Sequence, residues 1–78
     1  MTIAEAMGQT LREARERVPL SEVALGVRLG VSRQRIHQYE SGKFSLHTET
    51  LVKLAEALGT AATELLEEAL LKVGEAKD

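Results

Sequence analysis

The segment that decides the fold runs from Leu20 to Lys43 and reads LSEVALGVRLGVSRQRIHQYESGK. It contains two runs of helix-forming residues, and the second begins after Ser32, where a serine caps a helix by accepting a backbone N–H bond. Gly30 ends the first run, because helices commonly stop at a left-handed residue that glycine adopts without strain. The sequence therefore predicts helices over Glu22–Leu29 and Arg33–Ser41.

Two short helices that meet across such a turn form a helix-turn-helix unit. Apolar side chains that would fix the crossing angle stand at Leu25, Leu29, Val31 and Ile36. The second helix projects long hydrogen-bonding side chains outward, and Arg and Gln make the bidentate pairings that distinguish guanine and adenine in the major groove. The predicted base-reading residues are Arg33, Gln34, His37 and Gln38, and the alternative is an ordinary solvated helix face.

Phosphate contacts are expected from short donors and cations that flank the predicted reading helix. The predicted set is Ser32, Arg35, Lys43 and Ser45. For the two serines and the lysine the alternative is cap and loop chemistry, and for Arg35 it is plain solvation. Tyr39 is expected to pack in the fold rather than to stack on a base.

Three further helices are predicted in the sequence, one before this unit and two after it. Thr2 and Glu5 have the spacing of a capping box, in which each side chain bonds the other residue's backbone, and they open a helix predicted over Ile3–Arg17. The other two are predicted over Thr48–Leu58 and Ala62–Val73. The sequence thus predicts a compact all-α, five-helix domain over residues 1–74, with a frayed tail over 75–78.

The apolar periodicity predicts an apolar face on each of these helices, and the face of the fourth helix is expected to be buried. On the first, Ile3, Met7, Leu11, Ala14 and Val18 recur at helical spacing. On the fourth the stripe is Leu51, Leu54, Ala55 and Leu58, and on the fifth it is Leu65, Leu66, Ala69, Leu70 and Val73.

Composition excludes several other kinds of protein. The 78 residues contain no Cys, so neither a disulfide nor a thiolate metal site is expected. His37 and His47 have no cluster of acids to join, so we expect no metal. Neither a membrane-length apolar run nor a secretory signal is visible, and we expect a soluble, cytoplasmic protein without cofactor, small-molecule ligand or enzymatic activity.

Charge is unevenly distributed along the chain. The net charge is −2, but residues 1–43 carry seven Lys and Arg against five Glu, whereas residues 44–78 carry three Lys against seven acids. Because local field rather than net charge attracts a polyanion, the mildly basic first half is compatible with double-stranded DNA as the partner.

The central segment resembles the phage-repressor-like (Xre, Cro/cI) helix-turn-helix domains, and the resemblance extends over about residues 7–66. The matching residues are Leu20-Ser21, Leu25, Leu29-Gly30-Val31-Ser32, Ile36, Glu40 and Gly42-Lys43, with Leu11–Arg15 upstream and Leu51–Gly59 downstream. The resemblance implies a lambda-repressor-like fold in a prokaryotic or phage-encoded protein that is associated with the nucleoid when it is bound to DNA. Glu22 departs from the family, which often has a phosphate-contacting glutamine there, and its carboxylate would repel phosphate. Gly26 replaces the usual alanine.

The resemblance also implies an ion pair between Arg15 and Glu40 that ties the first helix to the end of the third. The alternative is two independent surface charges.

The last predicted helix has more apolar positions than a core of this size needs. We therefore expect a homodimer seam at Leu66, Ala69, Leu70 and Val73, and the alternative is that this face only closes the monomer core. The predicted function is a transcriptional regulator, a repressor that binds an inverted-repeat operator as a homodimer. An antitoxin-type autoregulator and a protein-interaction module on the same scaffold are the alternatives.

Overall fold

The computed structural model describes residues 1–76, which form five helices and no strand. The helices are α1 (Ile3–Arg17), α2 (Glu22–Leu29), α3 (Arg33–Ser41), α4 (Thr48–Leu58) and α5 (Ala62–Ala76). The all-α prediction and the bounds of the first four helices are confirmed. No helix within the described part of the chain is long and apolar enough to cross a membrane.

Helix α5 continues to Ala76, three residues beyond the end predicted at Val73. Gly74 does not stop it, because a glycine inside a helix costs only about 0.5–1 kcal/mol relative to alanine. A Cβ added there would meet nothing within 4 Å. Lys77 and Asp78 of the predicted frayed tail lie outside the described residues.

The helix starts have the predicted caps. The Thr2 hydroxyl accepts from the Glu5 amide at 3.1 Å, and the Glu5 carboxylate accepts from the Thr2 amide at 2.8 Å. Hydrogen bonds from the Thr2 backbone and side chain lower the pKa of Glu5. The Ser32 hydroxyl accepts from the Arg35 amide at 3.1 Å, and Gly30 closes α2 with φ 75° and ψ 31°. These bonds satisfy backbone groups that helix ends leave unpaired.

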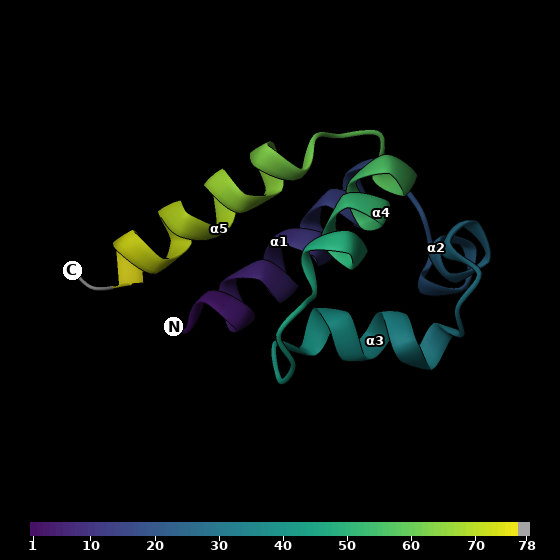
Figure 1. Cartoon of the computed structure of the whole chain (residues 1–78), viewed down its shortest axis with the longest axis horizontal. Coiled ribbons are helices and arrows are strands. Elements are labelled where there is room, and N and C mark those ends of the chain that lie inside the picture. The colour runs from purple at the N-terminus through teal and green to yellow at the C-terminus, as the bar shows by residue number, and fades with distance from the viewer. Residues whose placement is uncertain (77–78) are drawn as a thin grey trace.

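The helices surround one core in a body of 38 × 22 × 22 Å. Figure 1 shows α1 and α5 side by side, with α3 along the lower edge and α2 above the right end of α3. Each helix contributes one large side chain with at most 1% exposure: Leu11, Leu25, Ile36, Leu54 and Leu65. Burying such a side chain stabilises the fold by about 1.5–3 kcal/mol, so all five helices contribute to the stability of the core.

The predicted apolar stripe of α1 is buried only in its middle, at Met7, Leu11 and Ala14. Ile3 and Val18 are exposed, because the stripe runs past the helices that cover its middle. Ala6 and Thr10, which the periodicity did not single out, have no exposed surface. Leu66 and Leu70 of α5, which were assigned to a seam between protomers, are exposed.

Gly8 and Gly26 each allow two backbone segments to approach closely. A Cβ at Gly8 would lie 2.6 Å from the carbonyl oxygen of Glu40, where α1 crosses the end of α3. A Cβ at Gly26 would lie 2.7 Å from the carbonyl oxygen of Val31, in the turn that joins α2 to α3. The first contact sets the distance between α1 and α3, and the second sets the geometry of the turn.

Candidate nucleic-acid interface

Helix α3 is anchored to the protein by one face. Ile36 has no exposed surface, and Tyr39 is partly buried against the core, as expected. At about 100° per residue, Gln34 and Gln38 lie opposite Ile36. Gln34 is exposed and Gln38 is half-buried. The two predicted base readers that point most directly away from the core are therefore glutamines one turn apart.

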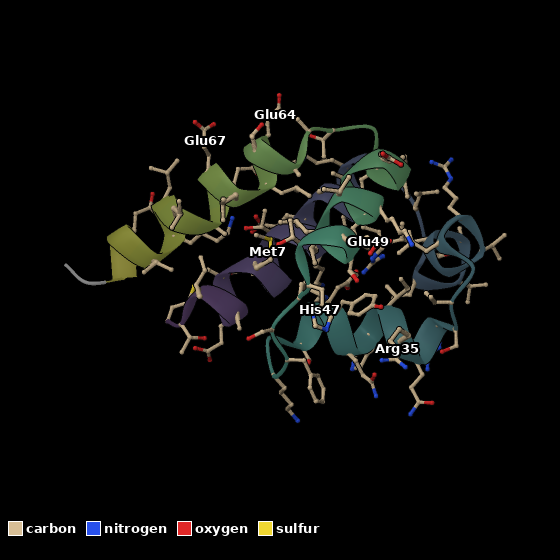
Figure 2. The ribbon with its side chains drawn as sticks, in the orientation of Figure 1. Met7, Arg35, His47, Glu49, Glu64 and Glu67 are labelled. Carbon is tan, nitrogen blue, oxygen red and sulfur yellow. The ribbon has the colours of Figure 1, made fainter. Side chains whose placement is uncertain are left out.

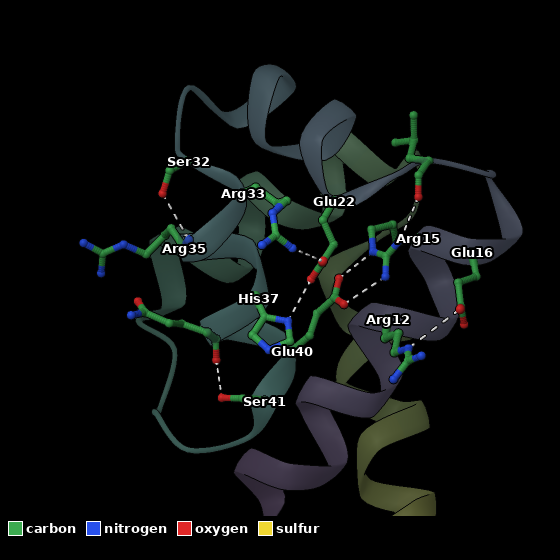
Figure 3. Close-up of polar contacts among 12 residues, drawn as sticks. Arg12, Arg15, Glu16, Glu22, Ser32, Arg33, Arg35, His37, Glu40 and Ser41 are labelled. Atoms are coloured by element: carbon green, nitrogen blue, oxygen red, sulfur yellow. Dashed lines mark hydrogen bonds and ion pairs between the residues drawn. The ribbon is translucent and has the colours of Figure 1, made fainter.

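The other two predicted base readers, Arg33 and His37, lie on the flank of α3 that faces the start of α2. The Glu22 carboxylate contacts both: Oε1 is 3.2 Å from Nη1 of Arg33, and Oε2 is 3.2 Å from Nδ1 of His37. Figure 3 shows the two contacts converging on one carboxylate. We expected these two side chains to project freely outward. They are exposed, but each is bonded to α2.

Arg35 leaves α3 on the opposite flank (Figure 3). With Gln38 and the loop after α3 it lines an open depression of about 250 Å³. Phe44 is an exposed part of that lining. Sequence reasoning missed Phe44, although a large apolar residue in an otherwise polar loop is a visible signal. The depression is lined by Arg35, Gln38, Tyr39, Phe44, Ser45, Leu46, His47 and Thr50.

The predicted phosphate donors fall into two places. Ser32 and Arg35 share the first turn of α3, where the serine oxygen caps the helix while its hydroxyl hydrogen stays available as a donor. Lys43 and Ser45 are exposed in the loop that follows Gly42. Both ends of α3 are therefore flanked by side chains that can donate to phosphate oxygens.

The ion pair between Arg15 and Glu40 is present and ties α1 to α3. Arg15 Nε donates to Glu40 Oε2 at 2.6 Å and Nη2 donates to Oε1 at 3.0 Å, while Nη1 donates to the carbonyl oxygen of Leu20 at 2.8 Å. The two side chains are 12% and 7% exposed. Hydrogen bonding to Glu40 raises the pKa of Arg15, so the guanidinium stays charged. The pair fixes the end of α3 against α1, and the same guanidinium also holds the segment that precedes α2.

The predicted dimer seam on α5 needs a correction. Ala69 has no exposed surface because it packs in the protomer's own core, so it is not available to a partner. Val73 is half-buried against that core. Leu66 and Leu70 remain 41% and 54% exposed, one turn apart. Leu66 also lines an apolar depression of about 180 Å³ with Ile3, Ala4, Met7, Ser45, Leu46 and Leu51.

Acidic side chains of α5 lie away from α3. Figure 2 shows Glu64 and Glu67 on the opposite side of the molecule from Arg35.

Within residues 1–76, no three His, Cys, Asp or Glu side chains gather as ligands for a metal ion would.

Comparison with known proteins agrees with this geometry. A sequence-family model of the helix-turn-helix domain matches residues 6–69. No curated protein is a significant sequence relative of the chain. Among solved structures, the clp gene regulator ClgR from Corynebacterium glutamicum is similar with a TM-score of 0.86 and 27% identity, over 90% of each chain.

Two other solved structures contain a similar fold in chains of different lengths. The restriction-modification controller protein C.AhdI from Aeromonas hydrophila is 32% identical, with a TM-score of 0.75, over 80% of this chain and 94% of its own. The FeII form of HppE is 28% identical, with a TM-score of 0.77, over 82% of this chain but only 34% of its own. The chain thus corresponds to nearly all of C.AhdI and to about a third of HppE.

The match over residues 6–69, the α2–turn–α3 geometry and the central motif agree with one another. The chain belongs to the helix-turn-helix domain family, of the phage-repressor-like type that its sequence resembles.

Proposed function

We propose that this protein is a sequence-specific regulator of transcription that binds double-stranded DNA in the cytoplasm through α3. The observation that carries the proposal is how α3 is held on the protein. Ile36 and Glu40 fix its inner face, and Gln34 and Gln38 lie on its outer face. A helix of this width fits the major groove of B-DNA, where glutamine pairs with adenine through its N6 and N7 atoms. The roles of ClgR as a gene regulator and of C.AhdI as a controller protein support it.

A homodimer is part of the proposal, because one such domain reads too few base pairs for useful specificity among the roughly 10⁶–10⁹ competing sites of a genome. Two copies related by a two-fold axis place their reading helices one DNA turn apart, about 34 Å. Leu66 and Leu70 supply an exposed apolar strip for the seam, and apolar surface continues around Leu66 onto Ile3 and Leu51. A dimer seated on its operator would repress by steric block.

The test of DNA recognition is selection of bound duplexes from a random pool, followed by sequencing. We expect inverted repeats whose half-site centres lie about ten to eleven base pairs apart. A pool that shows no enrichment after repeated rounds would contradict sequence-specific binding.

The glutamines of α3 should decide which bases are selected. On the selected operator, Gln34→Ala and Gln38→Ala should each weaken binding by about 1–3 kcal/mol and relax the preference at one position per half-site. Lys43→Ala should instead weaken binding to all duplexes alike, because a phosphate contact does not distinguish sequences. Equal losses on operator and random duplex for the glutamine variants would place base reading elsewhere.

The seam is tested by a charge placed on the exposed strip of α5. Leu70→Glu should give a monomer in analytical ultracentrifugation and weaken operator binding severely, because a carboxylate buried between two protomers has no partner. Leu71→Glu is the matched control, because Leu71 is also an exposed leucine of α5 but lies about 100° further round the helix. If Leu70→Glu stays dimeric, or if the wild-type chain is a monomer that still binds tightly, the α5 seam is wrong.

A further inference from the structure

Glu22 is the feature of the interface that the proposed function does not explain. It is the first residue of α2, next to the surface where DNA phosphates would lie, and its negative charge opposes binding of a polyanion. Its side chain is nevertheless only 19% exposed and has a partner on each carboxylate oxygen. The Glu22 carboxylate is therefore part of the contact between α2 and α3 and not an isolated surface charge.

The partners of Glu22 are one turn apart on α3 and belong to the predicted reading surface. Arg33 and His37 each lie 3.2 Å from a different oxygen, so the carboxylate fixes both side chains against the same flank of the helix. The neighbouring guanidinium of Arg15 makes its hydrogen bonds to Glu40 and Leu20 instead. Glu22 is thus directed toward the reading helix rather than toward α1.

The contact also changes the charge that α3 presents. Arg33 paired with a carboxylate contributes little net attraction for phosphate, whereas Arg35 and Lys43 have no acidic partner among the ion pairs of the described residues. Attraction to phosphate supplies non-specific affinity, whereas contacts to base edges supply specificity. A negative charge at this place therefore lowers affinity for any duplex while it keeps two side chains in a defined position.

From this geometry, and resting on the proposed function, we propose that Glu22 is a specificity-determining positioning residue. It holds Arg33 and His37 in place for the operator and reduces binding to DNA of other sequences. An uncharged residue at the same position would give tighter but less selective binding.

The test compares Glu22→Gln with wild type on the selected operator and on a random-sequence duplex. The variant is isosteric: it removes the charge and replaces one acceptor oxygen of the carboxylate by an NH2 donor. We expect affinity for the random duplex to rise about three- to ten-fold at low salt, with a salt slope steeper by roughly one unit per protomer. Affinity for the operator should rise less or fall, so that the ratio of the two affinities decreases.

Glu64→Gln is the matched control, because Glu64 is also an acid in the first turn of a helix but lies on the side away from Arg35 (Figure 2). It makes the same change in net charge and should leave the affinity ratio unchanged. Thermal melts of both variants by circular dichroism establish that they are folded. An equal effect of the two variants would reduce the role of Glu22 to net charge and overturn the proposal.

A second measurement needs no DNA. In the free protein, Glu22→Gln should shift the imidazole NMR resonances of His37 and leave those of His47 in place, whereas Glu64→Gln should shift neither. Unmoved His37 resonances would show that the carboxylate does not hold the ring. If wild type binds its operator and Glu22→Gln has the same affinity ratio, this inference alone fails. If no duplex is bound by either protein, the proposed function fails and takes this inference with it.

Discussion

Glu40→Ala is expected to lower the free energy of unfolding by about 3–5 kcal/mol, the usual cost of removing one partner from a buried ion pair. The change leaves the Arg15 guanidinium charged, largely buried, and bonded only to the carbonyl oxygen of Leu20. A single core of this size supplies about 3–5 kcal/mol in total. The variant should therefore be largely unfolded near room temperature in a denaturant titration followed by circular dichroism.

Two companion variants separate the ion pair from a general effect of substitution. Glu67→Ala removes an acid that points outward from α5 (Figure 2) and should change stability by less than about 0.5 kcal/mol. The double variant Arg15→Met/Glu40→Leu replaces the pair by apolar side chains and should recover most of the loss, because no buried charge is left unpaired. If Glu40→Ala and Glu67→Ala melt alike, the pair does not hold α1 against α3.

Gly8→Ala is expected to destabilise the protein by about 1–3 kcal/mol, the range for atoms forced into a packed site. The added methyl would lie 2.6 Å from the carbonyl oxygen of Glu40 and 3.0 Å from the amide nitrogen of Gly42. Both atoms belong to the backbone, so no side chain can swing away. The end of α3 must move from α1, which also strains the adjacent Arg15–Glu40 pair.

Gly74→Ala is the matched substitution for this prediction. It is also a helical glycine, but a methyl there meets nothing within 4 Å, so the helix preference of alanine should stabilise the protein by about 0.5–1 kcal/mol. The two variants should thus shift the midpoint of thermal unfolding in opposite directions. A rise in the midpoint for Gly8→Ala would contradict the close crossing of α1 and α3.

The helices could be predicted from sequence because their signals are local. Ser32 and Gly30 act on backbone groups within one turn, and they bound α2 and α3 correctly. The end of α5 was placed too early because Gly74 lies inside the helix and does not adopt the left-handed conformation with which Gly30 ends α2. Contacts between residues far apart in the sequence could not be predicted in this way. Nothing near Gly8 in the sequence indicates that the carbonyl oxygen of Glu40 lies against it.

In the candidate site, too, local features could be predicted and contacts between helices could not. Helical periodicity places Gln34 and Gln38 outward because that depends on one helix only. The contact of Glu22 with Arg33 and His37 depends on how α2 crosses α3, so sequence reasoning identified the charge but not its partners. Ala69 was assigned to a seam because it lies three residues after Leu66 and four before Val73 on the apolar face of α5, but it is buried in the protomer's own core.

We propose that α3 and the basic groups around it bind duplex DNA. The most direct test is a fluorescence anisotropy titration of the wild-type chain with the selected duplex at a series of salt concentrations. For about four to six phosphate contacts per dimer, the plot of log affinity against log salt should have a slope of roughly −4 to −5. A slope near zero, or no binding even to random duplex at low salt, would contradict the account.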